Sequence, residues 1–539
     1  MHLTDAELTK KAQWEKANFI LPQFDRAAMI AATTAAPTWV HFGAGNIFRA
    51  FPAVLQQKLL NEGIEQKGII VVEGYDYEII DRSYLPYDNL SLLVTLKVDG
   101  KIEKTVIGSL SEALHADSNN HRDFERLKEI FRAPSLQMVS FTITEKGYSL
   151  VRGNGEFLPE VIIDFQNGPT VPQSYIGKLA ALCYERYTHG ALPLALVSMD
   201  NCSHNGTKLY EAVHQFAVAW TKNNLVDQGF LAYIENPSQV SFPWSMIDKI
   251  TPRPDESVRA MLEKDGFEDT QGEITSKNTY VAPFVNAEEA EYLVIEDVFP
   301  AGRPQLEKAG VIFTTRATVD KVEKMKVCTC LNPLHTTLAI YGCLLGYTKI
   351  SAEMNDPELV KLVEAVGYRE GLPVVVDPGI ISPRAFIDEV LQVRLPNPFM
   401  PDTPQRIATD TSLKLPIRFG ETIKAYSASD QLNVRDLKYI PLVLAGWVRY
   451  LLGIDDAGNS FAISPDPILA TLTPMLAGIK PGQQGPFHPA LEPILANEMI
   501  FAVNLYEAGL GEMVENYFTE LMAGPGAVRV TLQKYLANL

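Results

Sequence analysis

The sequence has few cysteines, no long apolar run and a deficit of positive charge. Its 539 residues include five cysteines, a sparse and odd number that fits free thiols in a reducing compartment and excludes a disulfide scaffold. No run of about 18 uncharged apolar residues occurs, which excludes a membrane-spanning helix. A formal net charge of -18 repels polyphosphate chains and anionic lipid, so neither nucleic acid nor a membrane is an expected partner.

The amino-terminal segment also lacks the pattern of a signal peptide. It reads Met-His-Leu-Thr-Asp-Ala-Glu, with acidic residues where a signal peptide is basic and then apolar. We therefore expect a cytoplasmic protein. A hydrophobic fraction of 46% predicts compact packing, and the length exceeds one comfortable hydrophobic core, so two domains are expected.

A strand, a glycine turn, a helix and a second strand open the chain's first clear pattern. Residues 38–42 predict a buried strand, and the turn that follows reads Gly43-Ala44-Gly45-Asn46-Ile47-Phe48-Arg49. Gly43 permits a tight turn, and Gly45 lets a pyrophosphate approach the backbone at the amino end of a helix. This pattern is typical of a dinucleotide-binding unit. The third glycine of the full fingerprint is missing, so a glycine-rich turn in an ordinary α/β unit stays an alternative.

An acidic residue ends the second predicted strand, residues 68–73. Glu73 stands 28 residues beyond Gly45, where a carboxylate can bond the ribose hydroxyls and repel a 2′-phosphate. The sequence therefore predicts NAD rather than NADP as cofactor. Asp76, three residues on, is the rival for this role.

Polar residues follow two further predicted strands. Residues 137–144 run into Thr144-Glu145, and residues 194–199 deliver Asn201 and Asn205. Polar loops after buried strands are where α/β sheets place ligands, and two amides can bond an oxygen that gains negative charge. Turn-forming and capping roles are the alternative for both asparagines.

Strand patterns nearly vanish after residue 319, and helical patterns replace them. We predict an α/β protein: a Rossmann-type, doubly wound domain over residues 1–318 and a mostly α-helical domain over residues 319–539. Helices are expected at 334–347, 357–368, 385–392, 434–452, 493–507 and 511–521. A catalytic site is expected at the seam between the two domains, where clefts usually form.

An amine, a carboxamide and an imidazole gather near the start of the first of these helices. Lys326, Asn332 and His335 enter a segment that is otherwise apolar, which suggests proton transfer, because burial lowers the pKa of a lysine and frees its amine as a base. The alternatives are a helix cap, a solvated charge and a core histidine. Cys328, Cys330 and His335 as metal ligands lack the usual zinc-loop spacing, so we expect no metal.

Several segments together resemble the long-chain mannitol dehydrogenase and fructuronate reductase family of polyol and hexuronate dehydrogenases. The resemblance covers roughly Trp39 to Asp456. Its marks are Gly43-Ala-Gly45 with Arg49, Thr144-Glu-Lys-Gly-Tyr148, Ser198-Met-Asp-Asn201 with Asn205-Gly206, Phe242-Pro-Trp-Ser-Met-Ile-Asp248-Lys-Ile-Thr-Pro252, Ile295-Glu-Asp297 with Gly302-Arg-Pro304, Leu331-Asn332 with His335, and Arg406 with Asp410, Ser412 and Lys414.

The resemblance implies metal-independent hydride transfer with a lysine as general base. Its catalytic positions match Lys326, Asn201, Asn332 and His335. The family usually places the lysine five residues before the asparagine, whereas Lys326 is six before Asn332, and Pro333 replaces a usual glycine. A bulge can absorb one inserted residue, with Lys324 as the fallback base.

The resemblance also implies positions for cofactor and substrate. The predicted NAD-binding residues are Gly43, Gly45, Asn46, Ile47, Arg49, Glu73, Asp76, Thr144 and Glu145. The predicted substrate-binding residues are Asn205, Asp248, Arg406, Thr409 and Lys414. Two cations, Arg406 and Lys414, suit a carboxylate, although Arg406 can instead pair with Asp410 and brace a helix.

We therefore expect an enzyme that interconverts D-mannonate and D-fructuronate, with a small sugar acid or polyol as its only class of partner. Mannitol 2-dehydrogenase and tagaturonate reductase activities are alternatives, and Thr409 stands where mannitol-type members have histidine. A non-catalytic sensor of NAD and sugar acid is the alternative from another class. A monomer or a small homo-oligomer is expected.

Overall fold

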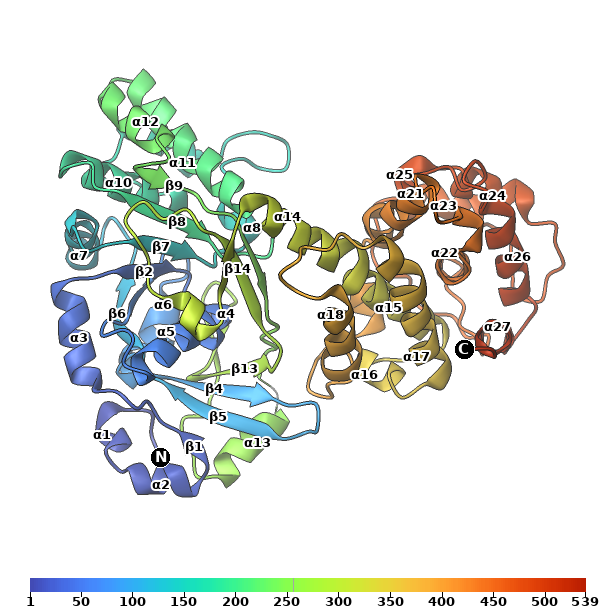
Figure 1. The fold of residues 1–539 in the computed structure, drawn as a ribbon, viewed down its shortest axis with the longest axis horizontal. Coiled ribbons are helices and arrows are strands. Elements are labelled where there is room, and N and C mark those ends of the chain that lie inside the picture. Colours follow the sequence, from blue (N-terminus) through green and yellow to red (C-terminus); the bar gives the residue numbers. More distant parts are fainter. Residues whose placement is uncertain (255) are drawn as a thin grey trace. The chain divides into compact units, whose positions relative to one another are not determined.

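The computed structural model describes residues 1–254 and 256–539, which form two compact units. The first unit holds Met1–Lys97 and Lys101–Val319, and the second holds Val98–Gly100 and Asp320–Leu539. Figure 1 shows that the first unit mixes strands and helices and that the second is built of helices. In the described residues, no helix is long and apolar enough to cross a membrane.

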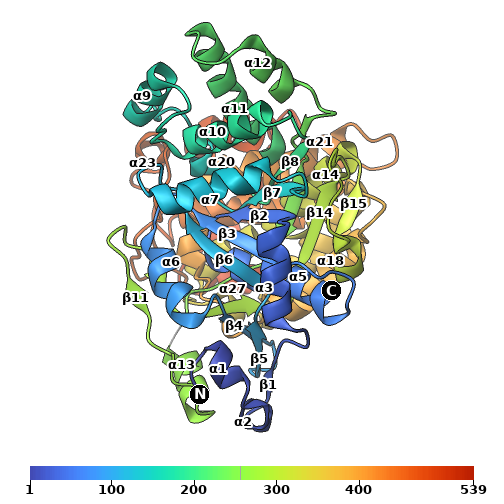
Figure 2. The ribbon, with the colours of Figure 1, turned by 90° about the vertical axis from the view of Figure 1, so that its left-hand side faces the viewer.

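A six-stranded parallel sheet forms the centre of the first unit. Its order is β6 (Leu110–His115), β3 (Ile69–Glu73), β2 (Trp39–Phe42), β7 (Met138–Phe141), β8 (Leu194–Ser198) and β9 (Val240–Ser241). Numbered within the sheet alone, this is the order 3-2-1-4-5-6 of a doubly wound dinucleotide-binding fold. Figure 2 shows β6, β3, β2 and β7 lying side by side in that order. The predicted fold class is confirmed.

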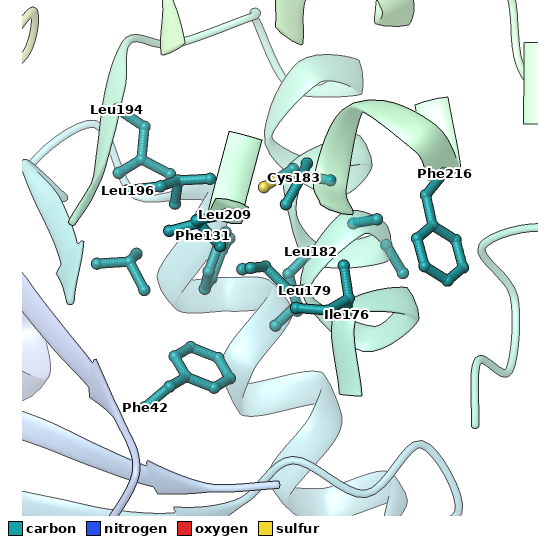
Figure 3. Close-up of a cluster of buried hydrophobic side chains, with 14 of the residues drawn as sticks. Phe42, Phe131, Ile176, Leu179, Leu182, Cys183, Leu194, Leu196, Leu209 and Phe216 are labelled. Atoms are coloured by element: carbon teal, nitrogen blue, oxygen red, sulfur yellow. The ribbon is translucent and has the colours of Figure 1, made fainter. Parts of the chain in front are cut away.

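Both faces of this sheet are buried, and successive residues alternate between them. Val40 and Phe42 face one core with α7 (His121–Arg132), α10 (Tyr175–Thr188), α11 (Asn205–Lys222) and α12 (Gln228–Glu235), whereas Trp39 faces another with α4 (Asn46–Ala50) and α5 (Pro52–Asn61). Figure 3 shows Phe131, Leu179 and Leu182 in the first core. Burial on both faces explains the continuous apolar runs of β3 and β8.

Three smaller sheets complete the first unit. Their orders are β1 (Phe19–Ile20), β5 (Ile102–Ile107), β4 (Ser91–Leu96) and β13 (Phe284–Glu288); β10 (Ser245–Asp248), β14 (Tyr292–Glu296) and β15 (Ile312–Thr314); and β11 (Glu273–Ile274) with β12 (Tyr280–Val281). The sequence pattern missed β5, β6, β10 and β13, because short strands with charged or small residues carry little periodic signal.

The second unit packs its helices around α15 (Asn332–Leu344), which is buried on nearly all sides as its composition predicted. α15 packs against α22 (Tyr439–Tyr450), which in turn packs against α26 (Gly511–Leu521). A Cβ at Gly446 would lie 2.7 Å from the ring of Tyr341, so glycine lets these two helices approach. Tyr341 also donates a hydrogen bond of 2.8 Å to the carbonyl of Leu442.

Two predicted helices are interrupted in the structure. Residues 434–452 divide into a 3-10 turn, η8 (Val434–Asp436), and α22, and residues 493–507 divide between α24 (His488–Leu495) and α25 (Glu498–Phe501). The carboxylate of Glu370 accepts hydrogen bonds from the backbone N–H groups of Lys438, Tyr439 and Ile440, which fixes where α22 begins. A tertiary contact therefore sets a boundary that local periodicity did not show.

Four π-helical turns are the unusual feature of the second unit. They are η3 (Lys326–Cys330), η4 (Ala365–Gly371), η6 (Val390–Arg394) and η7 (Pro416–Gly420). η3 packs against both η4 and η7. Turns of this kind are rare and often occur at functional sites.

Candidate functional site

The glycine turn after β2 is built for close contact. Gly43 has φ of +106°, and a Cβ at this residue would lie 2.2 Å from the carbonyl oxygen of Thr142. The N–H of Thr142 bonds the carbonyl of Phe42 at 2.9 Å. The ends of β2 and β7 therefore touch where the strand order reverses, which is where this fold binds ligands.

Gly45 leaves the room that a dinucleotide needs. It is the N-cap residue of α4, and a Cβ at this position would meet no atom within 4 Å. Space above a turn that ends at a helix amino terminus suits a pyrophosphate, which unpaired N–H groups attract. The turn therefore fits the group that the sequence predicted.

Glu73 is bound differently from the expectation. Its Oε1 accepts hydrogen bonds from the N–H groups of Gly74, Tyr75 and Asp76 at 2.9–3.2 Å, and its Oε2 accepts one from Ala44 at 3.0 Å. Burial raises the pKa of this carboxyl, and the four N–H groups oppose that rise. The carboxylate thus ties the glycine turn to the turn after β3, and it is buried rather than open to a ribose.

Asp76 does not replace Glu73 as an open carboxylate. Its Oδ2 accepts a hydrogen bond of 2.6 Å from the hydroxyl of Thr275, and the residue is buried. For Glu73 or Asp76 to contact both ribose hydroxyls, the side chain of that residue would therefore have to rearrange.

The other predicted cofactor residues make contacts within the first unit. Arg49 is buried and donates hydrogen bonds of 2.7 Å to the carbonyl of Ala282 and to Oδ1 of Asn46. Ile47 packs against the apolar core. Thr144 adopts φ of +64°, and Glu145 forms an ion pair with Lys208.

Asp200 is a structural residue at this edge that the sequence interpretation missed. It accepts hydrogen bonds from the N–H groups of Ile143 and Thr144, at 3.0 and 2.8 Å, and from the hydroxyl of Tyr148. Burial raises its pKa, and these bonds oppose the rise. Asp200 thereby joins the ends of β7 and β8 and sets the backbone that leads into Asn201.

The two asparagines after β8 differ in how much of the carboxamide is available. Asn201 is exposed, and no other described residue hydrogen-bonds its side chain. Asn205 is buried: its Nδ2 donates to the carbonyls of Ser198, Asp200 and Ser245, and its Oδ1 accepts from Gly206 and Ser245. Asn201 can bind a ligand oxygen, whereas the structure gives Asn205 the alternative role of bracing a turn. Asp248, another predicted substrate residue, is buried in β10.

Lys326 begins the π-helical turn η3. Its carbonyl accepts the N–H of Leu331 at 3.1 Å, five residues on, so one extra residue is accommodated between Lys326 and Asn332. Lys326 is only 3% exposed. The side chain of Lys324 is 55% exposed and pairs with Asp320 at 2.8 Å. These surroundings favour Lys326 over Lys324 as the base.

Asn332 is the first residue of α15 and not its cap. Leu331 occupies the N-cap position, so the capping alternative for Asn332 is wrong. The backbone carbonyl of Asn332 accepts the hydroxyl of Thr336 at 3.0 Å, while in the described residues nothing hydrogen-bonds its carboxamide. That group is half-buried and available to a ligand.

His335 lies in the first turn of α15 beside Asp402. Its Nε2 is 3.4 Å from Oδ2 of Asp402, but the geometry is not that of a hydrogen bond, and Nε2 has no hydrogen-bond partner among the described residues. Burial lowers the pKa of this imidazole, and the charge of Asp402 opposes that effect. His335 is therefore neutral at neutral pH and keeps one ring nitrogen available.

Three cations act on this imidazole through their charge. The charges of Arg418, Arg406 and Arg394 all act to lower the pKa of His335. Arg394 and Arg418 stand on η6 and η7, and neither residue nor Asp402 was a predicted site residue. Their sequence distance from His335 hid them, although Arg418 belongs to a charged stretch visible in the sequence.

Arg406 and Lys414 are both engaged within the helical unit. Arg406 stands on α19 (Pro404–Ile407), its side chain is 62% exposed, and it pairs with Asp402 rather than with Asp410, so that part of the alternative is wrong. Lys414 donates to the carbonyls of Ile407 and Thr409, and burial lowers its pKa to about 8.

The described residues contain no group of three or more His, Cys, Asp or Glu side chains placed to hold a metal ion. Cys328, Cys330 and His335 therefore do not form the metal site that was weighed from the sequence. Burial raises the pKa of the Cys328 thiol to about 11 and that of Cys330 to about 12, which disfavours the thiolate form that metals bind.

Comparisons with known proteins agree with this architecture. Residues 37–308 match the model described as the mannitol dehydrogenase Rossmann domain, and residues 318–522 match the mannitol dehydrogenase C-terminal domain. D-mannonate oxidoreductase of Thermotoga maritima is 55% identical over 540 residues, covering 100% of this chain and 99% of that protein. D-mannonate oxidoreductase of Escherichia coli is 30% identical, with 80% and 83% covered.

Two solved structures are similar over the whole chain. Mannitol 2-dehydrogenase of Pseudomonas fluorescens, in a ternary complex with NAD and D-mannitol, has a TM-score of 0.68 at 27% identity and covers 100% of both chains. A D-sorbitol dehydrogenase in substrate-free form has a TM-score of 0.80 at 26% identity, with 99% of this chain and 100% of that one covered.

Proposed function

The chain belongs to the mannitol dehydrogenase family of oxidoreductases, and from this premise we propose that it interconverts D-mannonate and D-fructuronate with NAD as cofactor. The observation that carries the substrate is the 55% identity with a D-mannonate oxidoreductase over the full chain. The cations around His335 support it, because a sugar acid carries a carboxylate that mannitol lacks.

The nucleotide-binding unit supports the cofactor proposal. Gly43 brings the ends of β2 and β7 together, and the open space at Gly45 suits a pyrophosphate at the amino terminus of α4. A solved relative carries NAD. NAD, when bound, supplies the acceptor for a hydride from the substrate carbon.

The helical unit supplies the groups that handle the proton. In the oxidation of D-mannonate, the amine of Lys326 takes the proton of the reacting hydroxyl while the hydride leaves the same carbon. Asn332 donates a hydrogen bond to the oxygen as it gains negative charge. Asn201 is assigned the same role because it matches a catalytic position of the family. Neutral His335 holds the lysine or a neighbouring hydroxyl. In reduction, Lys326 returns the proton.

The test is an absorbance assay at the NADH band over hexonates, hexuronates and polyols. We expect D-mannonate with NAD, and D-fructuronate with NADH, to give the highest kcat/KM. A preference for D-mannitol or D-tagaturonate would replace the substrate proposal by one of its alternatives. NADH binding without turnover of any compound would favour a sensor. Gel filtration with light scattering tests the prediction of a monomer or small homo-oligomer.

A further inference from the structure

Arg418 lies against the first turn of α15, beside the residues proposed to act on the substrate. Its Nη1 donates hydrogen bonds to the hydroxyl of Thr336 and, at 3.4 Å, to the backbone carbonyl of Asn332. It is carried by η7, which packs against η3, the turn that begins with Lys326. The guanidinium is thus fixed against the backbone of Asn332 in the first turn of α15.

The charge of Arg418 is not neutralised within the helical unit. Both partners of its Nη1 are neutral groups, and no carboxylate among the described residues pairs with it. Arg418 is half-buried, and this partial burial lowers the pKa of its guanidinium to about 10. Removing a charge from water is costly unless an opposite charge or several hydrogen bonds compensate for it.

Two fully buried arginines show what full compensation looks like in this protein. Arg186 donates five hydrogen bonds to backbone carbonyls through all three of its nitrogens. Arg449 likewise engages all three nitrogens with carbonyls. Arg418 uses Nη1 alone, which leaves Nε and Nη2 for another group.

The cations predicted from the sequence are less suited to receive an anion. The guanidinium of Arg406 is largely exposed and already paired with Asp402. The amine of Lys414 is held by two carbonyls. Arg406 therefore already has a carboxylate as counter-charge, and the ammonium of Lys414 lacks a planar pair of donors.

We infer that Arg418 binds the substrate's carboxylate and thereby sets the preference for sugar acids over neutral polyols. A guanidinium can present two parallel N–H donors to the two oxygens of a carboxylate, a geometry that lysine lacks. The inference rests on the proposed function, because it names the residue that reads the acid group of the same substrate.

The test compares D-mannonate with D-mannonamide, its uncharged amide, in wild type and in Arg418→Met. We expect the preference for the acid, measured as the ratio of KM or inhibition constants, to fall by about tenfold to a hundredfold, since a charge-assisted hydrogen bond is lost. Binding of NADH, followed by its fluorescence, should stay unchanged. Calorimetric titration with D-mannonate should show the same loss without turnover.

Three further variants make the result decisive. Lys424→Met removes an exposed cation that pairs with Glu421 at 3.0 Å on the helix after η7, and it should leave the preference unchanged. Arg418→Lys keeps the charge and should retain part of the preference, which covers the case in which the methionine variant does not fold. Arg406→Met tests the rival assignment.

Equal losses for acid and amide in both Arg418 variants would overturn the inference, as would a loss of preference confined to Arg406→Met. A wild-type enzyme that ignores D-mannonate and oxidises D-mannitol would instead overturn the proposed function. The two failures are therefore distinguishable.

Discussion

The polar side chains at the candidate site differ between the two units. In the nucleotide-binding unit, Glu73 accepts four backbone hydrogen bonds, Asp200 accepts three hydrogen bonds, and Asn205 uses both ends of its carboxamide. In the helical unit, Asn332 and His335 keep unused hydrogen-bonding capacity.

The difference indicates what each unit contributes. Buried polar groups are nearly always satisfied, so a set that is satisfied internally holds a rigid frame. Polar groups that keep unused hydrogen-bonding capacity need another partner, and at a candidate site that partner is a ligand. We therefore expect the first unit to present a finished cofactor cradle and the second to reach full satisfaction with substrate bound.

The largest expected effect comes from removing the base of the helical unit. Lys326→Ala should lower kcat by roughly a hundredfold to ten-thousandfold, because general-base catalysis is lost, while the dissociation constant of NADH stays near the wild-type value. Stopped-flow absorbance and NADH fluorescence measure the two quantities. Lys324→Ala is the matched control. A crippled Lys324→Ala with a normal Lys326→Ala would show that the catalytic lysine has been assigned in the wrong register.

A smaller effect is expected from loosening the frame of the first unit. Glu73→Ala leaves the N–H groups of Ala44, Gly74, Tyr75 and Asp76 without their acceptor. Each buried unsatisfied group costs about 1–3 kcal/mol, and relaxation recovers part of it, so NADH affinity should fall by about tenfold to a hundredfold with little change in kcat at saturation.

Calorimetry with NADH and NADPH separates the two roles of this residue. If Glu73 positions the turns, its alanine variant should weaken both cofactors by a similar factor. Selective improvement of NADPH binding would show that the carboxylate reads the ribose directly. A greater loss in Asp76→Ala would transfer the role to that residue.

The smallest effect on activity should come from changing a buried carboxyl group that has no hydrogen-bond partner among the described residues. Glu353, on α16 (Ile350–Glu353), is fully buried, and neither of its oxygens has a hydrogen-bond partner among the described residues. Burial, helped by the charge of Asp356, raises its pKa from 4.5 to about 9. Between about pH 4.5 and about pH 9, this carboxyl group is therefore protonated in the folded protein and ionised in the unfolded protein.

The sign of the pH dependence follows from that shift. The stability associated with protonated Glu353 is fully present below pH 4.5 and is lost as pH rises toward about 9, by up to about 1.4 kcal/mol per pH unit. Glu353→Gln should flatten this decline and raise Tm relative to wild type at pH 8 more than at pH 5, as measured by scanning calorimetry.

Glu370 provides the matched comparison, because it is buried in the same unit but accepts three backbone N–H groups. Glu370→Gln should lower Tm at both pH values, because its amide cannot accept all three bonds. Equal Tm shifts for Glu353→Gln at both pH values would mean that the Glu353 carboxyl ionises in the folded protein.

Much of the fold could be predicted, because its patterns are local. The Rossmann-type opening follows from the apolar run 68–73 and the glycines before it, and α26 has the bounds that its periodicity indicated. β5, with Glu103 and Lys104 at its centre, could not be recognised, because its pairing with β4 decides its conformation.

The site was predictable only as a set of residue types. Lys326, Asn332 and His335 are close in sequence, so their grouping was visible, whereas Arg418 reaches Thr336 from 82 residues away. The binding of Glu73 by four N–H groups depends on two turns meeting, which no spacing reveals. The catalytic and binding roles stay predictions that the experiments above can test.

The π-helical turn η3 changes how a helical wheel can be used on this part of the chain. Successive residues of an α-helix are about 100° apart around the helix axis. On a helical wheel, one added residue therefore rotates the residues before it by roughly 100° relative to the residues after it. A helical wheel that runs from α14 (Arg316–Met325) through α15 and ignores the π-helical turn would therefore place Lys326 on the wrong side of the helix relative to α15. Deleting one residue from 327–330 should remove the π-helical turn and give the five-residue spacing between Lys326 and Asn332 that the family usually has, so the two residues should keep their relative direction.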